Sequence, residues 1–167
     1  MLSLGKVTMS YDFEKTSVDL YRAVFVDNYA VDVSCYLQPD KDLANAADIA
    51  PILHPAFESA PSPELPRRPP DIVPNRKTGL YDPDSGGTSV FDRRGVLRSA
   101  DWDFWIPGGT DVPPGLKVKN DGFSKRLKAT HYTIMPAKPM QKICLMGQLD
   151  NFTRNAIRCQ YEKARGL

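Results

Sequence analysis

The chain has 167 residues, 41% of them hydrophobic, and a formal net charge of +2. This length fits one domain with a hydrophobic core and is too short for two, and no apolar run reaches the roughly 18 residues of a membrane span. The N-terminus lacks the apolar stretch of a signal peptide, so we expect a cytoplasmic protein without a membrane anchor, whose export would use a leaderless route. Three cysteines without a C-x-x-C pair and only two histidines give no zinc-binding pattern, which predicts a reduced, metal-free protein.

The charges are unevenly distributed along the chain. Residues 1–60 carry 4 basic and 9 acidic side chains, whereas residues 117–167 carry 11 basic and 3 acidic ones. The C-terminal third could attract a dinucleotide, a nucleic acid or an acidic partner protein, although pairing with the acidic N-terminal third would explain the same pattern. No RNA-binding or DNA-binding motif accompanies the basic residues, so nucleic-acid binding stays open.

The first predicted element is a strand. Residues 1–8 are expected to be a disordered extension that precedes a single domain at residues 9–167. Residues 17–25 alternate aliphatic and polar positions and favour a strand with Arg22 on the face opposite Tyr21. Arg22 then lies either in an ion pair at the sheet edge or in a cleft.

A short helix and a long proline-rich loop come next. Residues 40–50 are rich in alanine, begin with Asp40 as a capping residue and stop before a proline, which predicts a helix. Eight of the 15 prolines fall between Pro51 and Pro74, where neither a helix nor a central strand can persist. Several hydrophobic residues are interspersed among them, so we expect an ordered loop that packs on the domain and carries Arg68 near a cleft.

The tetrapeptide Gly86-Gly87-Thr88-Ser89 opens the next predicted strand. Glycines let a backbone approach a phosphate or ribose closely, and adjacent side chains of a strand point to opposite faces. One of the two hydroxyls should therefore face any cleft. A tight turn whose hydroxyls satisfy only local backbone groups is the alternative.

The remaining pattern predicts short strands and one long helix. Strands are expected at residues 96–97 after a hairpin turn at 92–95, at 103–107, at 116–119 and at 129–136. Residues 139–163 contain no proline after Pro139 and place their apolar residues on one stripe, which predicts an amphipathic helix. Several strands with one early and one late helix indicate an α+β single domain.

Four segments in this order resemble a known family. They are residues 21–25, 86–92, 129–139 and 146–152, and through them residues 9–167 resemble the type VI secretion effector toxins represented by the second of the Tse series. The resemblance implies a split β-sheet of the ADP-ribosyltransferase toxin type around a cleft for NAD. It also implies delivery by the type VI secretion machinery into a competitor's cytoplasm, and inhibition in the producer by a cognate immunity protein.

The resemblance assigns roles to residues at matching positions. It implies a catalytic set of Thr88, Ser89 and His131, and a cofactor-binding set of Arg22, Arg68, Gly86, Gly87, Thr88 and Ser89. An arginine fork suits a pyrophosphate, and a histidine near neutral pH suits acid or base catalysis. Each side chain also has a structural alternative. Arg22 would fit as a strand-edge ion pair, Arg68 as a solvated loop charge and His131 as a core histidine.

One expected feature of ADP-ribosyltransferases is missing from the sequence. These enzymes hold the ribose with a glutamate near the third core strand, yet no acidic residue lies between Thr130 and Gln148. The nearest candidates are Gln141, Gln148, Asp150 and Glu162. Transfer to protein side chains, NAD hydrolysis, modification of another acceptor and toxicity by binding alone therefore remain alternatives.

Overall fold

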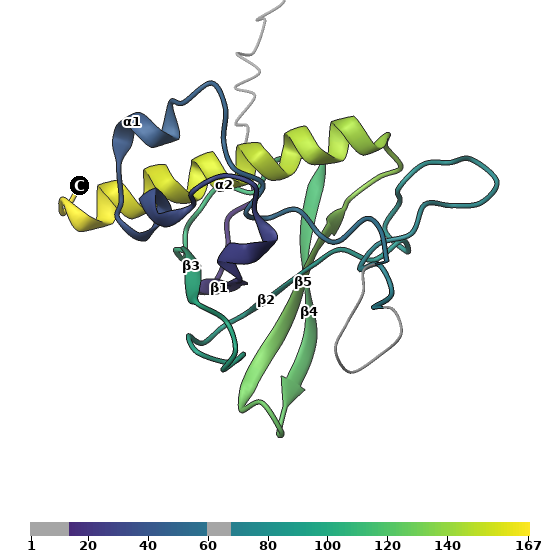
Figure 1. Ribbon diagram of the computed structural model, residues 1–167, viewed down its shortest axis with the longest axis horizontal. Coiled ribbons are helices and arrows are strands. Elements are labelled where there is room, and N and C mark those ends of the chain that lie inside the picture. Colours follow the sequence, from purple (N-terminus) through teal and green to yellow (C-terminus); the bar gives the residue numbers. More distant parts are fainter. Residues whose placement is uncertain (1–13, 60–67) are drawn as a thin grey trace, which may run out of the picture.

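A five-stranded antiparallel sheet packs against a long C-terminal helix (Figure 1). This computed structural model describes residues 14–59 and 68–167, so the predicted extension at residues 1–8 lies outside the described residues. The strands are β1 Leu20–Val24, β2 Thr88–Phe91, β3 Trp102–Ile106, β4 Leu116–Ser124 and β5 Ala129–Pro136. The helices are the 3-10 turns η1 Val26–Asn28 and η2 Ser34–Leu37, the short α1 Lys41–Ala44 and the long α2 Lys142–Ala164. The α+β prediction is confirmed.

The sheet is almost divided between β1 and β2. The strand order is β3-β1-β2-β5-β4, and β1 and β2 pair only at Tyr21 and Phe91. By contrast, β1 pairs with β3 over its whole length, and β2 does so with β5. The two halves therefore separate on either side of one residue pair, which is the split sheet that the resemblance implied.

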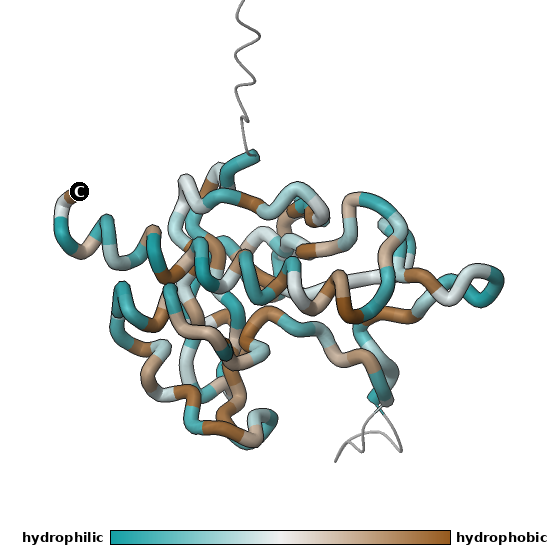
Figure 2. Tube along the Cα trace, turned by 90° about the horizontal axis from the view of Figure 1, so that it is seen from above, coloured by the Kyte–Doolittle hydropathy of each residue, from teal (hydrophilic) through white to brown (hydrophobic). Residues whose placement is uncertain are grey.

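The hydrophobic core lies between α2 and one face of the sheet. The α2 residues Leu145, Leu149, Phe152, Ala156 and Ile157 are buried. Steps of three or four residues from Leu145 to Ala156, with Ile157 next to Ala156, place them on one side of the helix. Hydrophilic and hydrophobic positions accordingly alternate along α2 in Figure 2. Across from this stripe lie the buried strand residues Leu20, Val24, Val90, Ile106 and Ile134.

The described parts of the proline-rich loop are packed on the domain, as predicted. Ile52 and Leu53 are fully buried, and Ile72 is 1% exposed. The backbone amide of Asp71 donates to the carbonyl of Ala56 at 2.8 Å, which ties the two ends of the loop together. The described parts of the loop therefore form a wall beside the split in the sheet.

The predicted helix at residues 40–50 is correct in its cap and wrong in its length. The Asp40 carboxylate accepts a hydrogen bond from the amide of Asp42 at 2.8 Å, but α1 ends at Ala44. The backbone groups after Ala44 form tertiary hydrogen bonds instead. The Tyr36 hydroxyl accepts from the amide of Ala50, and Arg154 donates to the carbonyl of Ala47. These bonds compete with continuation of the helix.

The predicted strand at residues 96–97 is also wrong. Residues 92–100 form a series of turns, and β3 pairs with β1 rather than with β2. The Asp103 carboxylate accepts from the amide of Gly95 at 2.8 Å, and the amide of Asp101 donates to the carbonyl of Val24. These long-range bonds lead the chain across to β1.

No helix among the described residues is long and apolar enough to span a membrane.

Candidate functional site

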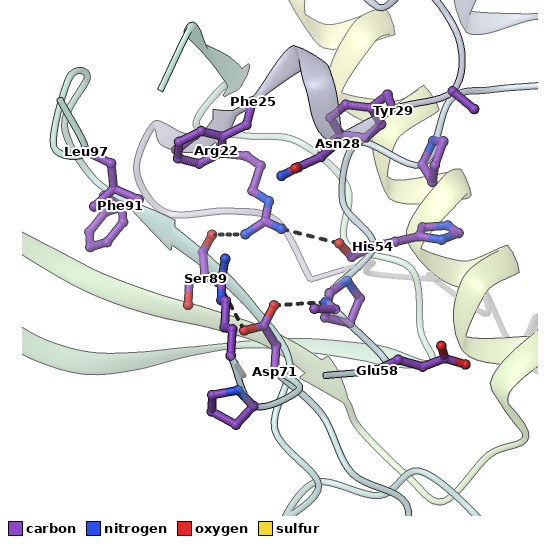
Figure 3. Close-up of a pocket in the computed structure, with 17 residues that line it drawn as sticks. Arg22, Phe25, Asn28, Tyr29, His54, Glu58, Asp71, Ser89, Phe91 and Leu97 are labelled. Carbon is purple, nitrogen blue, oxygen red and sulfur yellow. Dashed lines mark hydrogen bonds and ion pairs between the residues drawn. The ribbon is translucent and has the colours of Figure 1, made fainter. Parts of the chain in front are cut away.

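A cavity of about 770 Å³ lies where the sheet divides between β1 and β2 (Figure 3). Its walls come from β1 and η1, from the described parts of the proline-rich loop and from β2. Its described lining includes two arginines, two carboxylates and the rings of two phenylalanines and one tyrosine, namely Arg22, Arg68, Glu58, Asp71, Phe25, Phe91 and Tyr29. This volume and mixed lining are typical of small-molecule sites.

Arg22 holds the two sides of the cavity together. Its Nη1 donates to the carbonyl of Ser89 at 3.0 Å, and its Nη2 donates to the carbonyl of His54 at 3.3 Å (Figure 3). The Nε atom is buried and has no partner within the described residues. A guanidinium carries five N–H donors, so three of them make no hydrogen bond within the described residues. Burial lowers the pKa of Arg22, and the neighbouring Tyr29 and Asp71 oppose that shift.

Arg68 lies in the same cavity, as the sequence predicted for its loop. Its Nη2 is 3.5 Å from the carboxylate of Asp71, and 61% of its side chain is exposed. The other oxygen of Asp71 accepts from the amide of Ala56 at 2.8 Å. Because its partner is fixed by the backbone and its own side chain is exposed, Arg68 is available to an anion at the cavity mouth.

Glu58 supplies a carboxylate that sequence reasoning did not find. It lines the cavity, is exposed, and forms no hydrogen bond or ion pair within the described residues. Asp71, the other carboxylate of the cavity, is already engaged by Ala56 and Arg68. Glu58 lies in the proline-rich loop, away from the third core strand, and no periodic sequence pattern marks its position.

The two adjacent hydroxyls lie on opposite faces of β2, as predicted. Thr88 is fully buried, and its hydroxyl donates to the carbonyl of Leu53 at 2.6 Å, which anchors the loop to the sheet. Ser89 is exposed and lines the cavity. Ser89 is therefore the hydroxyl that faces the cleft, whereas a contact between Thr88 and NAD stays a prediction.

The two glycines before these hydroxyls are required by close packing within the chain. A Cβ on Gly86 would lie 2.3 Å from the carbonyl oxygen of Asp71, and one on Gly87 would lie 2.1 Å from that of Ile134. Gly86 also has a φ of +105°, which an L side chain rarely adopts. Neither glycine lines the cavity, so their predicted approach to a phosphate also stays a prediction.

His131 is paired with an aspartate that a β-bulge brings to it. Asn120 pairs with Tyr132 and Gly122 pairs with His131, so the register shift leaves Asp121 as the extra residue. The Asp121 carboxylate is 2.8 Å from Nδ1 of His131 and accepts from the Thr133 hydroxyl at 2.5 Å. Bulges redirect side chains in this way. Donation from Nδ1 leaves Nε2 free to accept a proton.

His131 lies beside the cavity rather than in its wall. Its ring contacts that of Phe91 edge to face, with centroids 5.2 Å apart, and Phe91 lines the cavity. His131 also stands opposite Phe91 in the pairing of β2 with β5, two residues from the Thr133 that faces Ser89. The structure thus brings Arg22, Arg68 and Ser89 together and leaves His131 at the rim.

Separate substitutions should distinguish the roles of the two hydroxyls. Thr88→Val is expected to lower the free energy of unfolding by about 1–3 kcal/mol, because it leaves the buried Leu53 carbonyl without its donor. Ser89→Ala is expected to change it by less than about 0.5 kcal/mol, since its hydroxyl is exposed. Urea unfolding measures both values. Equal effects of the two changes would contradict this division.

The fold and cavity define a class: a single α+β domain with a cavity at a divided antiparallel sheet, whose two arginines suit a small anionic ligand. Comparison with models of protein families matches residues 18–161 to the family described as "Tse2 ADP-ribosyltransferase toxin". The chain belongs to this family. It is also 69% identical over 159 residues to the protein named "Toxin Tse2" from Pseudomonas aeruginosa (strain PAO1), an alignment that covers 95% of this chain and 100% of the relative.

These comparisons confirm the resemblance drawn from the four sequence segments. The protein is a toxin with an ADP-ribosyltransferase domain, and enzymes of that family use NAD as their substrate. Within the described residues, no group of three or more His, Cys, Asp and Glu side chains could hold a metal ion.

Proposed function

We propose that the cavity binds NAD, with the pyrophosphate on Arg22 and Arg68 and the nicotinamide ribose at Ser89. The observation that carries this assignment is Arg22: its guanidinium is fixed by two carbonyls, and its Nε has no partner within the described residues. A guanidinium with free donors binds two phosphate oxygens at once. The rings of Phe25, Tyr29 and Phe91 offer apolar surface for the nicotinamide.

The proposed reaction is transfer of ADP-ribose from NAD. The bond between nicotinamide and C1 of the ribose breaks, nicotinamide leaves with the bonding electrons, and positive charge develops on the ribose. Glu58 is a carboxylate of the cavity lining that forms no hydrogen bond or ion pair within the described residues. In Figure 3 its carboxylate points away from Arg22 and Ser89, so in the proposed step it turns toward the ribose and stabilises that charge. A nucleophilic atom of the acceptor then bonds to C1 and gives up its proton to Nε2 of His131 at the rim. With water as the acceptor, the same steps give NAD hydrolysis.

Titration with NAD tests the assignment directly. Calorimetry should show saturable binding of NAD to the purified protein, and chromatography should show the release of nicotinamide. Ser89→Ala should weaken NAD binding about 2- to 10-fold, since one ligand hydrogen bond contributes about 0.5–1.5 kcal/mol. Failure of the wild-type protein to bind NAD, while folded, would overturn the assignment.

Asp121→Asn should slow the reaction at least tenfold, because Asp121 orients the imidazole that receives the proton. An NMR spectrum of the imidazole nitrogens should show at the same time that His131 loses its Nδ1–H tautomer, which a purely structural role would not require. Asp84→Asn, at an exposed residue whose side chain makes no hydrogen bond within the described residues, is the matched control. An unchanged rate in Asp121→Asn with an altered tautomer would exclude His131 as the base.

In the cell, the proposed role is that of a type VI secreted toxin that acts in the recipient cytoplasm. The family description and the name of the Pseudomonas relative, which both describe a Tse2 toxin, support this role. The cognate immunity protein would cover the cavity mouth at Ser89 and His131, through an interface of about 1,600 Å² in total. Thr88 is buried in the chain itself, so its side chain would not touch this partner.

Expression in bacteria tests this cellular role. The chain alone should arrest growth, and co-expression of the immunity protein should restore it. The Ser89→Ala variant, expressed at the same level, should arrest growth less. Normal growth with abundant, folded and partner-free wild-type protein would show that the chain is not an intracellular toxin.

A further inference from the structure

A second concave surface, the basic groove, lies outside the proposed NAD site. It has a volume of about 730 Å³ and lies between the loop after β2 and the turn between β4 and β5. That turn forms the end of the β4–β5 hairpin, which extends away from α2 in Figure 1. Among the described residues, the charged side chains that line the groove are all cations, namely Arg93, Arg98, Arg126 and Lys128.

The cations of the basic groove have few partners. Arg93 joins the two sides of the groove, because its Nε donates to the carbonyl of Lys128 at 3.2 Å and its Nη2 to that of Leu127 at 2.8 Å. The side chains of Arg98, Arg126 and Lys128 form no hydrogen bond or ion pair within the described residues. Like charges gathered in a concave surface attract anions strongly. The groove is thus suited to a ligand with several negative charges.

The basic groove and the cavity are neighbours. Leu97 lines both of them. Phe91 of the cavity wall packs in one hydrophobic cluster with Val96 and Leu127 of the groove. An extended ligand in the groove would therefore reach the cavity rim, where His131 contacts Phe91.

We propose that the basic groove binds the phosphodiester backbone of a single-stranded nucleic acid and that this strand is the acceptor of ADP-ribose. Three of the four cations are arginines, whose planar forks bind two phosphate oxygens. The groove is small, with a volume of about 730 Å³, whereas a stable protein partner would cover about 800 Å² of surface on each side. The inference rests on the proposed NAD chemistry. In the transfer, an oxygen or nitrogen of the strand bonds to C1 of the ribose, nicotinamide leaves with the bonding electrons, and the acceptor's proton passes to His131.

Binding is tested without NAD. Fluorescence anisotropy with labelled single-stranded RNA and DNA of about 12 nucleotides gives Kd at several salt concentrations. The double variant Arg98→Glu with Arg126→Glu should weaken binding at least tenfold and reduce the salt slope by about two. The matched control, Lys41→Glu with Lys163→Glu, has the same net charge but is altered in α1 and at the end of α2.

The binding results distinguish a specific contribution of the groove cations from an effect of the protein's overall positive charge. The proposal is supported if the wild-type protein binds one or both oligonucleotides strongly and only the groove variant loses that binding. Equal losses in the groove variant and the control would overturn it. Tighter binding of polyglutamate than of either oligonucleotide would also overturn it, in favour of an acidic protein partner. If thermal melting shows that the double Glu variant is unfolded, Arg98→Gln with Arg126→Gln replaces it under the same criteria.

Transfer is tested with NAD and the same oligonucleotides. Mass spectrometry should detect an ADP-ribose adduct on the strand, and the groove variant should lose at least nine-tenths of it while releasing nicotinamide at the normal rate in the absence of nucleic acid. Release of nicotinamide by the wild-type protein without any adduct would overturn the acceptor proposal alone. A wild-type protein that releases no nicotinamide would instead contradict the NAD chemistry, whereas binding to the groove is judged independently by anisotropy.

Discussion

Replacing Glu58 by glutamine is expected to lower the rate of nicotinamide release about 100-fold and to change the Kd for NAD less than about twofold. Glu58 is the carboxylate of the cavity that no other side chain engages within the described residues. Its charge matters most when positive charge develops on the ribose, and much less while NAD is only bound. Glutamine keeps the size of the side chain and removes that charge.

Single-turnover measurements of nicotinamide release, together with calorimetric titration of NAD, check this expectation. Glu162→Gln is the matched control, because Glu162 lies near the end of α2 and does not line the cavity. Asp71→Asn is a second comparison that should disturb the loop through Ala56 and Arg68, and so also weaken NAD binding. A normal rate in Glu58→Gln would mean that the ribose charge is stabilised by another group.

The elements that the sequence predicted well are those with dense local signals. Residues 129–136 alternate β-favouring side chains without interruption, and β5 has the same bounds. Asp40 caps α1 as expected, because a cap depends on residues only two or three positions away. Strand pairing is a long-range property, so the partnership of β3 with β1 had no local signal.

The candidate site was predictable in part, for a related reason. A period of two requires that Thr88 and Ser89 lie on opposite faces, but only the packing against Leu53 determines which one is buried. The pairing of Asp121 with His131 depends on a bulge, and one inserted residue cannot be read from alternation. The position of Glu58 at the cavity depends on how the proline-rich loop packs beside the division between β1 and β2. Sequence thus indicated the residue types, and tertiary packing determined which of them meet.

Arg22→Lys is expected to raise the Kd for NAD about 10- to 100-fold, although the positive charge is kept. The guanidinium bonds two carbonyls, of Ser89 and His54, and its other N–H donors, which have no partner within the described residues, are the ones proposed to bind the pyrophosphate. An ammonium has three donors and no planar fork, so it cannot make all these bonds at once. Each charge-assisted hydrogen bond that is lost costs about 1.5–3 kcal/mol.

Calorimetric titration of NAD measures this effect, and thermal melting shows whether the cavity wall survives the change. Arg76→Lys serves as the control, since Arg76 lies in an exposed turn outside the cavity. Arg68→Lys should have a smaller effect, of about threefold, because 61% of the Arg68 side chain is exposed and solvent weakens its interaction with an anion. Binding of NAD by a folded Arg22→Lys variant within about twofold of wild type would contradict the placement of the pyrophosphate on Arg22, and would direct attention to Arg68 and the cavity mouth.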